Sequence, residues 1–430
     1  MCCHEDTFLL TLRKPQNNRF YCSCERLFRP DLRNTPIVTL SNNDGCIIAL
    51  TDEAKALGLR MGDPYFKIKD FLRDNGVVAF SSNYALYGDI SSRVQQTIES
   101  MVPRAEVYSI DELFADLTGI QEPVGDFARE IQSRIKLWVG MPVGIGIGHT
   151  KTLAKAAQHA SKVYKKQTGG VVDLRSEHAV KWLLQRMPCN EVWGVGRRLT
   201  EHLSAQNVTT AWQLANLDPK TVRQRYGVVL ERTVRELSGE ACIELQETEP
   251  DRQAICTSRM FGTRVTTKPG MQEAIAAYMH RASQKLRKQR SLTGVIRIGI
   301  RTSPFGEGPK YSNAVTITPP YPTDDVLLLT RLANEAINTI WRDGFKYSKA
   351  EILLMDLRKR GEYTEDLFTP SQSIKSDSLM RVLDQVNRRF GKNAVHSGRM
   401  PLSPDWEMRR ELLSPSYTTS FYQLMKFAAI

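Results

Sequence analysis

Apolar and polar positions along the chain divide it into regions of different secondary structure. Short apolar runs bounded by turn residues predict strands at 36–40, 46–50 and 143–148, and helical patterns such as 151–166 alternate with them. Strands that alternate with helices predict an α/β or α+β first domain. The stretch from 179 to 246 contains short helical patterns only.

A mixed pattern returns after a polar linker. Strands are expected at 294–301, 314–318 and 351–357, and helices at 271–287 and 325–342. The first 18 residues show no clear period. We therefore expect a multidomain α+β protein, with predicted boundaries at 1–178, 179–246, 247–254 for the linker, 255–357, and 358–430 for a C-terminal tail.

The positive charge of the chain is concentrated in the second mixed region. The 430 residues carry a net charge of +12, and 41% hydrophobic with 25% charged residues is typical of a globular protein. Between 251 and 360 there are 19 Lys and Arg against 9 Asp and Glu, a net charge of +10. Localised positive charge of this kind favours a polyanionic partner such as nucleic acid.

Cysteine spacing and hydropathy argue against several other classes. The eight cysteines form no C-x-x-C pair and no zinc-like spacing with histidine, so we expect reduced thiols. No apolar run approaches the ~20 residues that span a bilayer, and the apolar stretch 8–12 is too short for the core of a signal peptide. These features predict a cytoplasmic protein with no membrane partner.

The strongest candidate for chemistry is the acidic pair Asp111-Glu112. Apolar runs at 106–110 and 113–117 predict two strands that meet at this pair. Neighbouring side chains on a regular strand point to opposite faces, so both carboxylates can serve one site only where the strand breaks at a turn. Two carboxylates at a turn suit Mg²⁺, which takes few protein oxygens together with substrate phosphates. The alternative is an ordinary acidic turn.

A stripe of lysines is the second candidate. Lys151, Lys155, Lys162 and Lys166 lie on one face of the helix predicted at 151–166, directly after a glycine-rich strand. Because helix N-termini favour anions, this position supports a phosphate-binding role. The alternative is a solvated cationic face.

Two further features favour contacts with a nucleic-acid backbone. Gly194-x-Gly196, followed by two arginines, resembles a helix-hairpin-helix turn, whose N–H groups can hold a phosphate without reading sequence. In the basic region, positive residues crowd the end of one predicted helix, namely Arg281, Lys285, Arg287, Lys288 and Arg290. Such binding should weaken steeply as the salt concentration rises.

Several motifs together resemble the UmuC-type Y-family DNA polymerases. They follow the family's order from about residue 19 into the tail: Phe20-Tyr21-Cys22-Ser23-Cys24-Glu25, Ser41-Asn42-Asn43-Asp44-Gly45-Cys46, Glu53-Ala54-Lys55-Ala56-Leu57-Gly58, Tyr108-Ser109-Ile110-Asp111-Glu112, Thr150-Lys151-Thr152-Leu153-Ala154-Lys155, Trp193-Gly194-Val195-Gly196-Arg197-Arg198, Ser258-Arg259-Met260-Phe261-Gly262 and Leu413-Ser414-Pro415-Ser416-Tyr417-Thr418-Thr419. The resemblance implies a right-hand polymerase with a ferredoxin-like palm, small fingers, a helical thumb carrying the helix-hairpin-helix, and an α+β little finger.

The resemblance also implies an activity, a cofactor and partners. The activity is error-prone translesion DNA synthesis in the SOS response, in which a primer 3′-hydroxyl attacks the α-phosphate of a dNTP at a site holding two Mg²⁺ ions. Primer-template DNA and dNTP are the expected ligands. A UmuD-like dimer, a RecA filament and the sliding clamp are the expected protein partners, although the clamp-binding peptide is reduced to Leu367 and Phe368.

The resemblance assigns roles to individual residues. Asp111 and Glu112 match the catalytic metal carboxylates, and Tyr21 matches the steric gate that rejects ribonucleotides; a core aromatic is the alternative for Tyr21. The expected nucleotide-binding residues are Phe20, Tyr21, Lys55 and Lys162, and the expected DNA-binding residues are Gly194, Gly196, Arg197, Arg198, Arg259, Arg281, Lys285 and Arg287.

One departure from the family pattern concerns the third metal ligand. In the family, a strand carrying an Asp precedes the Phe-Tyr pair by four residues, and that position here is Gln16 within a polar stretch that does not read as a strand. A neutral amide is a poor bridge between two Mg²⁺ ions. An altered N-terminus followed by intact sequence would explain the pattern. The chain is therefore either an active translesion polymerase or a catalytically impaired, DNA-binding remnant of one.

Overall fold

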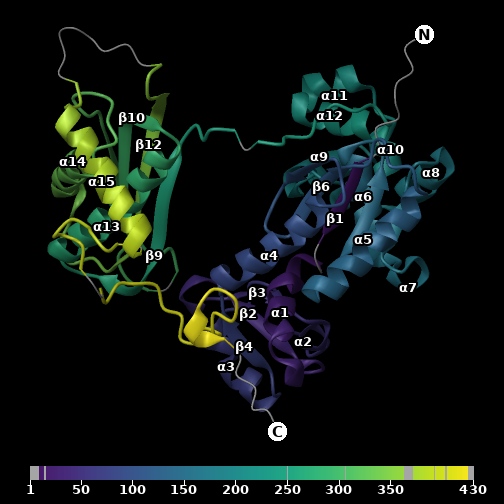
Figure 1. Cartoon of the computed structure of the whole chain (residues 1–430), viewed down its shortest axis with the longest axis horizontal. Coiled ribbons are helices and arrows are strands. Elements are labelled where there is room, and N and C mark those ends of the chain that lie inside the picture. The colour runs from purple at the N-terminus through teal and green to yellow at the C-terminus, as the bar shows by residue number, and fades with distance from the viewer. Residues whose placement is uncertain are drawn as a thin grey trace. The chain divides into compact units, whose positions relative to one another are not determined.

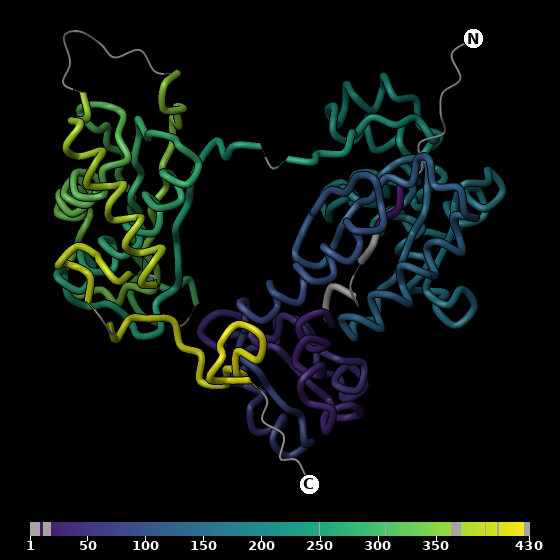
Figure 2. Tube along the Cα trace, in the orientation of Figure 1, coloured from purple at the N-terminus to yellow at the C-terminus, as the bar shows by residue number. Residues whose placement is uncertain are grey.

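The structure, a computed structural model, describes residues 9–13, 16–248, 250–305, 307–362, 371–391, 393–401 and 404–424, and omits the side chains of 12–18. The chain forms two compact units (Figures 1 and 2). The first unit comprises 1–249 together with 411–430, and the second comprises 250–410. The stretch 358–430, predicted as one tail, is thus divided between the two units. Leu367 and Phe368 lie outside the described residues.

A five-stranded sheet forms the centre of the first unit. Its strands, in spatial order, are β5 (Arg104–Val107), β6 (Glu112–Asp116), β1 (Leu9–Arg13), β7 (Gly144–Gly148) and β8 (Val171–Asp173). Strand β1 pairs antiparallel with both β6 and β7, and β7 pairs parallel with β8. This is the mixed sheet expected for the palm.

The N-terminal strand β1 lies within the first 18 residues, whose sequence shows no clear period. Leu9, Leu10 and Thr11 are buried between two neighbouring strands, which supply the backbone partners of this short segment. A five-residue strand carries too few positions to show a period by itself. Gln16 does not belong to a strand, since it is the first residue of helix α1 (Gln16–Leu27).

Helices cover both faces of this sheet. On one face, α4 (Tyr84–Glu99) and α5 (Val124–Val139) contribute to a core that also contains Ile145 and Ile147 of β7. On the other face, α6 (Lys151–Val163) lies directly on β7. The two elements are so close that a Cβ at Gly146 would overlap the backbone of α6. The helix predicted at 151–166 ends earlier, and a short α7 (Lys165–Thr168) follows it.

A smaller sheet forms the fingers. Its strands are β3 (Ile47–Leu50), β2 (Ile37–Leu40) and β4 (Val78–Ser81), with α2 (Asp52–Ala56) and α3 (Tyr65–Asp74) beside them. The strands predicted at 36–40 and 46–50 are confirmed. Strand β4 lies at the edge of this sheet, next to residues 412–413 of the C-terminal segment.

The thumb consists of short helices with one shared core. These are α8 (Glu177–Arg186), α9 (Arg197–Ser204), α10 (Ala211–Ala215), α11 (Pro219–Tyr226) and α12 (Val228–Leu237). The buried carboxylate of Glu236 on α12 accepts hydrogen bonds from the backbone and the hydroxyl of Thr152, at 2.9 and 2.8 Å. Because Thr152 lies in the first turn of α6, this pair holds the thumb against the palm.

The second unit is a four-stranded antiparallel sheet packed with helices. Its strands are β11 (Ser312–Ile317), β10 (Ser291–Thr302), β12 (Tyr347–Lys359) and β9 (Ile255–Val265), and its helices are α13 (Lys268–Lys288), α14 (Val326–Ile340) and α15 (Ile374–Phe390). The sequence did not predict β9. Trp406, in the segment after α15, packs on Phe261 and Tyr278, so this segment also contributes to the core of the second unit. Among the described helices, none is long and apolar enough to cross a bilayer.

Candidate active site

A cavity of about 700 Å³ lies in the first unit between palm, fingers and thumb. Its lining comprises Phe20, Tyr21, Met61, Tyr108, Ser109, Asp111, Glu112, Lys155, Gln158, His159, Lys162, Asn190, Glu191 and Trp193. Both carboxylates singled out in the sequence line this cavity, as do three of the four predicted nucleotide-binding residues. The fourth, Lys55, is on α2 and is not among the lining residues.

The acidic pair is held by its own turn. Asp111 lies in the connection between β5 and β6, and Glu112 is the first residue of β6. The hydroxyl of Ser109 donates to Oδ1 of Asp111 at 2.6 Å and accepts the Asp111 N–H at 3.2 Å. The Ser109 N–H in turn donates to the carbonyl of Glu112 at 3.1 Å. The turn therefore fixes both acidic residues at one wall of the cavity.

Lys155, expected from the sequence only as a member of the lysine stripe, lies at the acidic pair. Its Nζ donates to Oε2 of Glu112 at 2.7 Å, and both side chains are 9% exposed. The ammonium also lies over the rings of Tyr108 and Trp193, with 5.2 and 5.7 Å to the centroids. A buried cation thus neutralises one of the two acids. Its i+4 spacing from Lys151 did not reveal this pairing.

The stripe is not a solvated face at its N-terminal end. Lys151 is buried, forms an ion pair with Glu106, and donates to the carbonyl of Glu244 at 2.7 Å. Glu106 also accepts the backbone N–H of Gln246 at 2.8 Å. Lys151 therefore anchors the segment after the thumb to the palm, and Lys162 remains as a stripe residue at the cavity wall.

Tyr21 combines a packed ring with a place on the cavity. Its ring stacks on that of Tyr87, with centroids 4.5 Å apart and planes inclined by 16°, and meets the edge of Tyr84 at 6.0 Å. Burial, and then proximity to Tyr84 and Asp111, raises the pKa of Tyr21 to about 12. The ring is therefore a neutral wall close to the acidic pair. Phe20 packs into the palm core beside it.

Lys55 lies outside the lining of the cavity, close to the guanidinium of Arg19. Burial lowers its pKa, and the nearby guanidinium of Arg19 lowers it further. Arg19 itself forms an ion pair with Asp52, at the start of α2. A phosphate role for Lys55 therefore stays a prediction.

The predicted helix-hairpin-helix residues come together on the thumb surface. Gly194 has φ +90°, which favours glycine, and Gly196 is the N-cap of α9. Both glycines are exposed, as are Arg197 and Arg198, and Arg197 forms an exposed ion pair with Glu201. This surface is suited to phosphate contacts.

In the second unit, three of the predicted DNA-binding residues surround one groove. Arg259 on β9 joins Arg281 and Lys285 on α13, in a groove of about 430 Å³. Burial lowers the pKa of Arg281, and Arg259 lowers it further. Arg287 does not join them. Its guanidinium forms a two-pronged ion pair with Asp384 of α15, at 2.7 and 2.8 Å, and its side chain is only 6% exposed.

Arg287 therefore ties α13 to α15 inside the unit, and a DNA contact at this residue stays a prediction. Its sequence neighbours gave no sign of this, because the partner acid lies 97 positions further along the chain.

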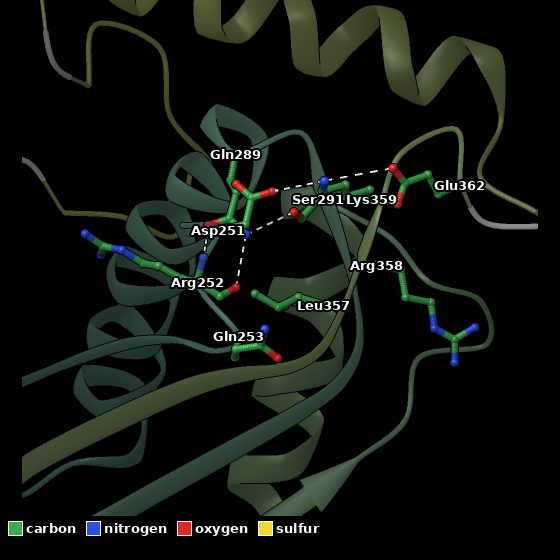
Figure 3. A pocket seen from close by; sticks show the side chains of 9 residues that line it. All are labelled: Asp251, Arg252, Gln253, Gln289, Ser291, Leu357, Arg358, Lys359 and Glu362. Carbon is green, nitrogen blue, oxygen red and sulfur yellow. Dashed lines mark hydrogen bonds and ion pairs between the residues drawn. The ribbon is translucent and has the colours of Figure 1, made fainter. Parts of the chain in front are cut away.

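A second cavity of the basic unit, about 580 Å³, is lined in part by residues 251–253, where the linker joins this unit (Figure 3). Gln289 exchanges two hydrogen bonds with the backbone of Arg252, each 3.0 Å, and donates to Ser291. Lys359 lies 3.6 Å from Asp251. Because these groups pair with one another, we interpret the cavity as an anchor for the linker rather than as a ligand site.

The chemistry of the acidic pair fits a hard divalent cation. Carboxylate oxygens are the donors that Mg²⁺ prefers, with substrate phosphates completing its shell. Within the described ranges, no group of three His, Cys, Asp or Glu side chains is arranged to hold a metal ion. Asp111 and Glu112 thus form a two-acid site, and one of the two acids already faces an ammonium group.

Solved structures with the same fold define the class of protein. The chain resembles a Y-family DNA polymerase chimera of Dbh and Dpo4, with a TM-score of 0.63 and 15% identity, over 82% of this chain and 100% of that chain. It also resembles an insertion ternary complex of Dbh DNA polymerase, with a TM-score of 0.52 and the same identity and coverage. The fold is that of a Y-family DNA polymerase.

Sequence relatives define the family more closely. The model of the impB/mucB/samB family matches residues 17–159, that of the family's C-terminal domain matches 252–367, and a domain of unknown function, DUF4113, matches 377–426. The UmuC protein of Salmonella typhimurium is 46% identical over 413 residues, covering 95% of this chain and 98% of the relative. The MucB protein of Escherichia coli is 42% identical over 408 residues, covering 94% and 96%. The chain belongs to the impB/mucB/samB family of UmuC-type polymerases.

These comparisons confirm the predicted family, fold class and enzyme class. At the level of the family, the chain is an error-prone translesion DNA polymerase of the SOS response. Use of a divalent metal and binding of primer-template DNA and dNTP follow from that membership. The roles of individual residues and the protein partners are separate questions.

Proposed function

We propose that the cavity between palm, fingers and thumb is a nucleotidyl-transfer site for synthesis past damaged template bases. The observation that carries the proposal is that Tyr21, the acidic pair and Lys162 line one cavity, although they come from sequence positions far apart. A volume of about 700 Å³ is sufficient for a nucleoside triphosphate and leaves room at an open face.

Each wall of the cavity has a distinct role in this proposal. Asp111 and Glu112 would hold the divalent cation that accompanies the phosphates of the incoming dNTP. Lys162 faces the triphosphate, whose negative charge also attracts Lys155. The ring of Tyr21 is assigned to exclude a ribose 2′-hydroxyl and so to select deoxyribose, which its place on the cavity wall supports. The bound cation would polarise the α-phosphate towards a primer 3′-hydroxyl.

Contacts with DNA are assigned to two surfaces, one in each unit. The exposed glycine turn of the thumb, with Arg197 and Arg198, suits the phosphates of duplex DNA, and the groove around Arg259, Arg281 and Lys285 suits a further stretch of backbone. Family membership supports a cytoplasmic location and contacts with a UmuD-like dimer, a RecA filament and a sliding clamp. These stay predictions for this chain.

A second candidate function is that of a DNA-binding protein with impaired catalysis. The family's third acid would be Gln16 by counting back from Phe20, and the residue of β1 that pairs in register with Glu112 is Arg13. Neither position is acidic. Two Mg²⁺ ions a few ångströms apart repel each other strongly in a partly desolvated site unless carboxylates bridge them. This favours binding of DNA and nucleotide with slow primer extension.

Primer-extension and binding measurements on the full chain separate the two candidates. The variants Asp111→Asn and Glu112→Gln keep the shape of the side chains and remove their charge. For an active polymerase, the unmodified chain extends a primer in Mg²⁺ and each variant loses about 100-fold or more. For an impaired remnant, the unmodified chain binds primer-template DNA and dNTP but extends no faster than its variants. Absence of Mg²⁺-dependent dNTP binding would contradict both.

A further inference from the structure

The C-terminal segment Glu411–Tyr417 docks against the fingers and the palm of the first unit, as Figure 1 shows for its yellow part beside β4. Residues 412–413 extend the edge of the fingers sheet: the Ser81 N–H donates to the carbonyl of Leu412 at 2.9 Å, and the Leu412 N–H donates to the hydroxyl of Ser81 at 3.0 Å. Tyr417 stacks on Phe28 of the loop after α1, with centroids 4.7 Å apart. The segment is therefore held at both ends.

Between these ends, Ser414 is buried at the start of α4. The side-chain amide of Asn83, the N-cap residue of that helix, donates to the carbonyl and to the hydroxyl oxygen of Ser414, each at 3.1 Å. The same amide donates to the carbonyl of Pro415 at 3.3 Å. Helix α4 carries Tyr84 and Tyr87, so the C-terminal segment contacts the cap of the helix that packs against Tyr21.

A second path leads from Ser414 to the same rings. The Ser414 hydroxyl donates to Oε1 of Glu25 at 3.1 Å, and the phenol of Tyr87 donates to the same oxygen at 2.6 Å. Glu25 is fully buried, and its other oxygen has no hydrogen-bond partner among the described residues. Burial raises the pKa of Glu25 to about 7, although both hydroxyl donors lower it. Glu25 is not among the lining residues of the cavity, and its two hydrogen-bond donors are Ser414 on the C-terminal segment and Tyr87 on the side of the cavity.

Tyr87 completes the path to the nucleotide site. It is fully buried, and its ring stacks on Tyr21 at 4.5 Å between centroids. A ring that excludes a ribose 2′-hydroxyl must be held within a fraction of an ångström, because a small displacement would open room for one oxygen atom. Tyr87, the stacking partner of Tyr21, donates its phenol proton to Oε1 of Glu25, and the Ser414 hydroxyl donates to the same oxygen.

We infer that Ser414 is a positioning residue for sugar selection, acting on Tyr21 through Glu25 and Tyr87. The inference rests on the proposed role of Tyr21 as the gate. It gives the C-terminal segment, which lies within the matched domain of unknown function, a part in choosing deoxyribonucleotides. The chain supplies this part from a segment 393 positions after the gate residue.

The test measures nucleotide binding, so that it does not depend on how fast this chain extends a primer. The full-length chain is bound to a primer-template with a 3′-deoxy primer end and Mg²⁺, and the Kd values of dCTP and rCTP opposite a template dG are determined. Ser414→Ala should lower the ratio of rCTP to dCTP Kd by about threefold or more, with the Kd of dCTP nearly unchanged. Ser416→Ala is the matched control, since it removes a hydroxyl two residues along that forms none of these contacts.

The variant Tyr21→Ala separates a failure of the role of Ser414 from a failure of the proposed gate role of Tyr21. If Tyr21→Ala abolishes the preference and Ser414→Ala leaves it intact, the gate stands and the role of Ser414 is overturned. If Tyr21→Ala leaves the preference intact, the gate assignment fails and the inference falls with it. An equal loss of affinity for both nucleotides in Ser414→Ala means a purely structural role and also overturns the inference. Combined with Tyr21→Ala, Ser414→Ala should have no additional effect on the ratio.

Discussion

The Nζ of Lys155 lies 2.7 Å from Oε2 of Glu112, and both side chains are almost fully buried. Each group offsets the desolvation of the other, so the pair is stable only as long as both charges are present. A divalent cation bound at Glu112 would compete with Lys155 for the same carboxylate. The ion pair is therefore coupled to metal binding.

The first prediction follows from this coupling. Lys155→Met keeps the apolar stem and leaves the buried Glu112 without its cation, so we expect a loss of about 3 kcal/mol in the free energy of unfolding. Millimolar Mg²⁺ should recover part of this loss, because a cation then returns to the carboxylate. Thermal unfolding with and without Mg²⁺ measures both effects. Lys166→Met, an exposed position on α7, is the control, and an equal Mg²⁺ shift in both variants would contradict the coupling.

The second prediction concerns the basic groove of the second unit. Replacing Arg259, Arg281 and Lys285 by Ala should weaken binding of primer-template DNA and reduce the slope of log Kd against log salt by about 2 to 3, since each lost phosphate contact removes about 0.9. Binding titrations over a salt series on the full chain measure the slope. A slope unchanged in the triple variant would show that DNA does not follow this groove.

Arg287→Met is the matched control for that series. It removes the same kind of charge from the same helix, but from a residue paired with Asp384 inside the unit. We expect lower stability, by about 3 kcal/mol, and an unchanged salt slope among folded molecules. A reduced slope here would return Arg287 to the DNA contacts.

The third prediction uses the buried carboxyl of Glu25. Its pKa in the folded chain is about 7 against a reference of 4.5, so the folded state holds its proton more tightly than the unfolded state. The stability that this group contributes is therefore complete below pH 4.5 and is lost as pH rises to about 7, by about 3 kcal/mol. Glu25→Gln keeps an acceptor for Tyr87 and cannot ionise.

Denaturant unfolding at several pH values gives the difference in stability between the unmodified chain and Glu25→Gln. This difference should shift in favour of the variant as the pH rises from about 5 to about 7.5. The comparison cancels the titration of groups common to both proteins. A difference that does not vary with pH would mean that Glu25 is ionised throughout in the folded chain.

Much of the site could be predicted because its residues sit in short, ordered motifs. The acidic pair, Tyr21 and the glycine turn lie in segments whose local spacing carries information, and the structure brings the pair and Tyr21 to one cavity. The strands at 36–40 and 143–148 were visible for the same reason, as apolar runs bounded by turns. What could be read from the sequence was local.

Contacts between distant segments could not be predicted. The partner of Lys155 lies 43 positions away and that of Arg287 lies 97 positions away, so each lysine or arginine looked like surface charge. Strand β1 has five residues, and its stability comes from the strands on either side rather than from its own pattern. The contact of Ser414 with Glu25 spans 389 positions and carries no local sign at all.

The last prediction concerns the missing third acid. Strand β1 limits the change that should be needed to restore catalysis. Because a regular strand already pairs with β6 and β7 at Leu9–Arg13, restoring catalysis should not require a new N-terminal segment. The family spacing puts the third acid four residues before Phe20, so we expect that Gln16→Asp alone raises Mg²⁺-dependent primer extension by about 100-fold, the order of effect of one charge at a reacting centre. Single-turnover extension of a matched primer-template measures the gain.

Asn17→Asp and Asn18→Asp add the same charge one and two positions nearer Phe20 than the family spacing requires, and they should give no comparable gain. An equal gain from all three would indicate a general electrostatic effect on Mg²⁺ or on the N-terminus of α1 rather than a ligand. Vigorous extension by the unmodified chain would contradict the impaired-catalysis hypothesis directly. In that case another acid completes the site, and Asp6, which lies outside the described residues, becomes the residue to replace first.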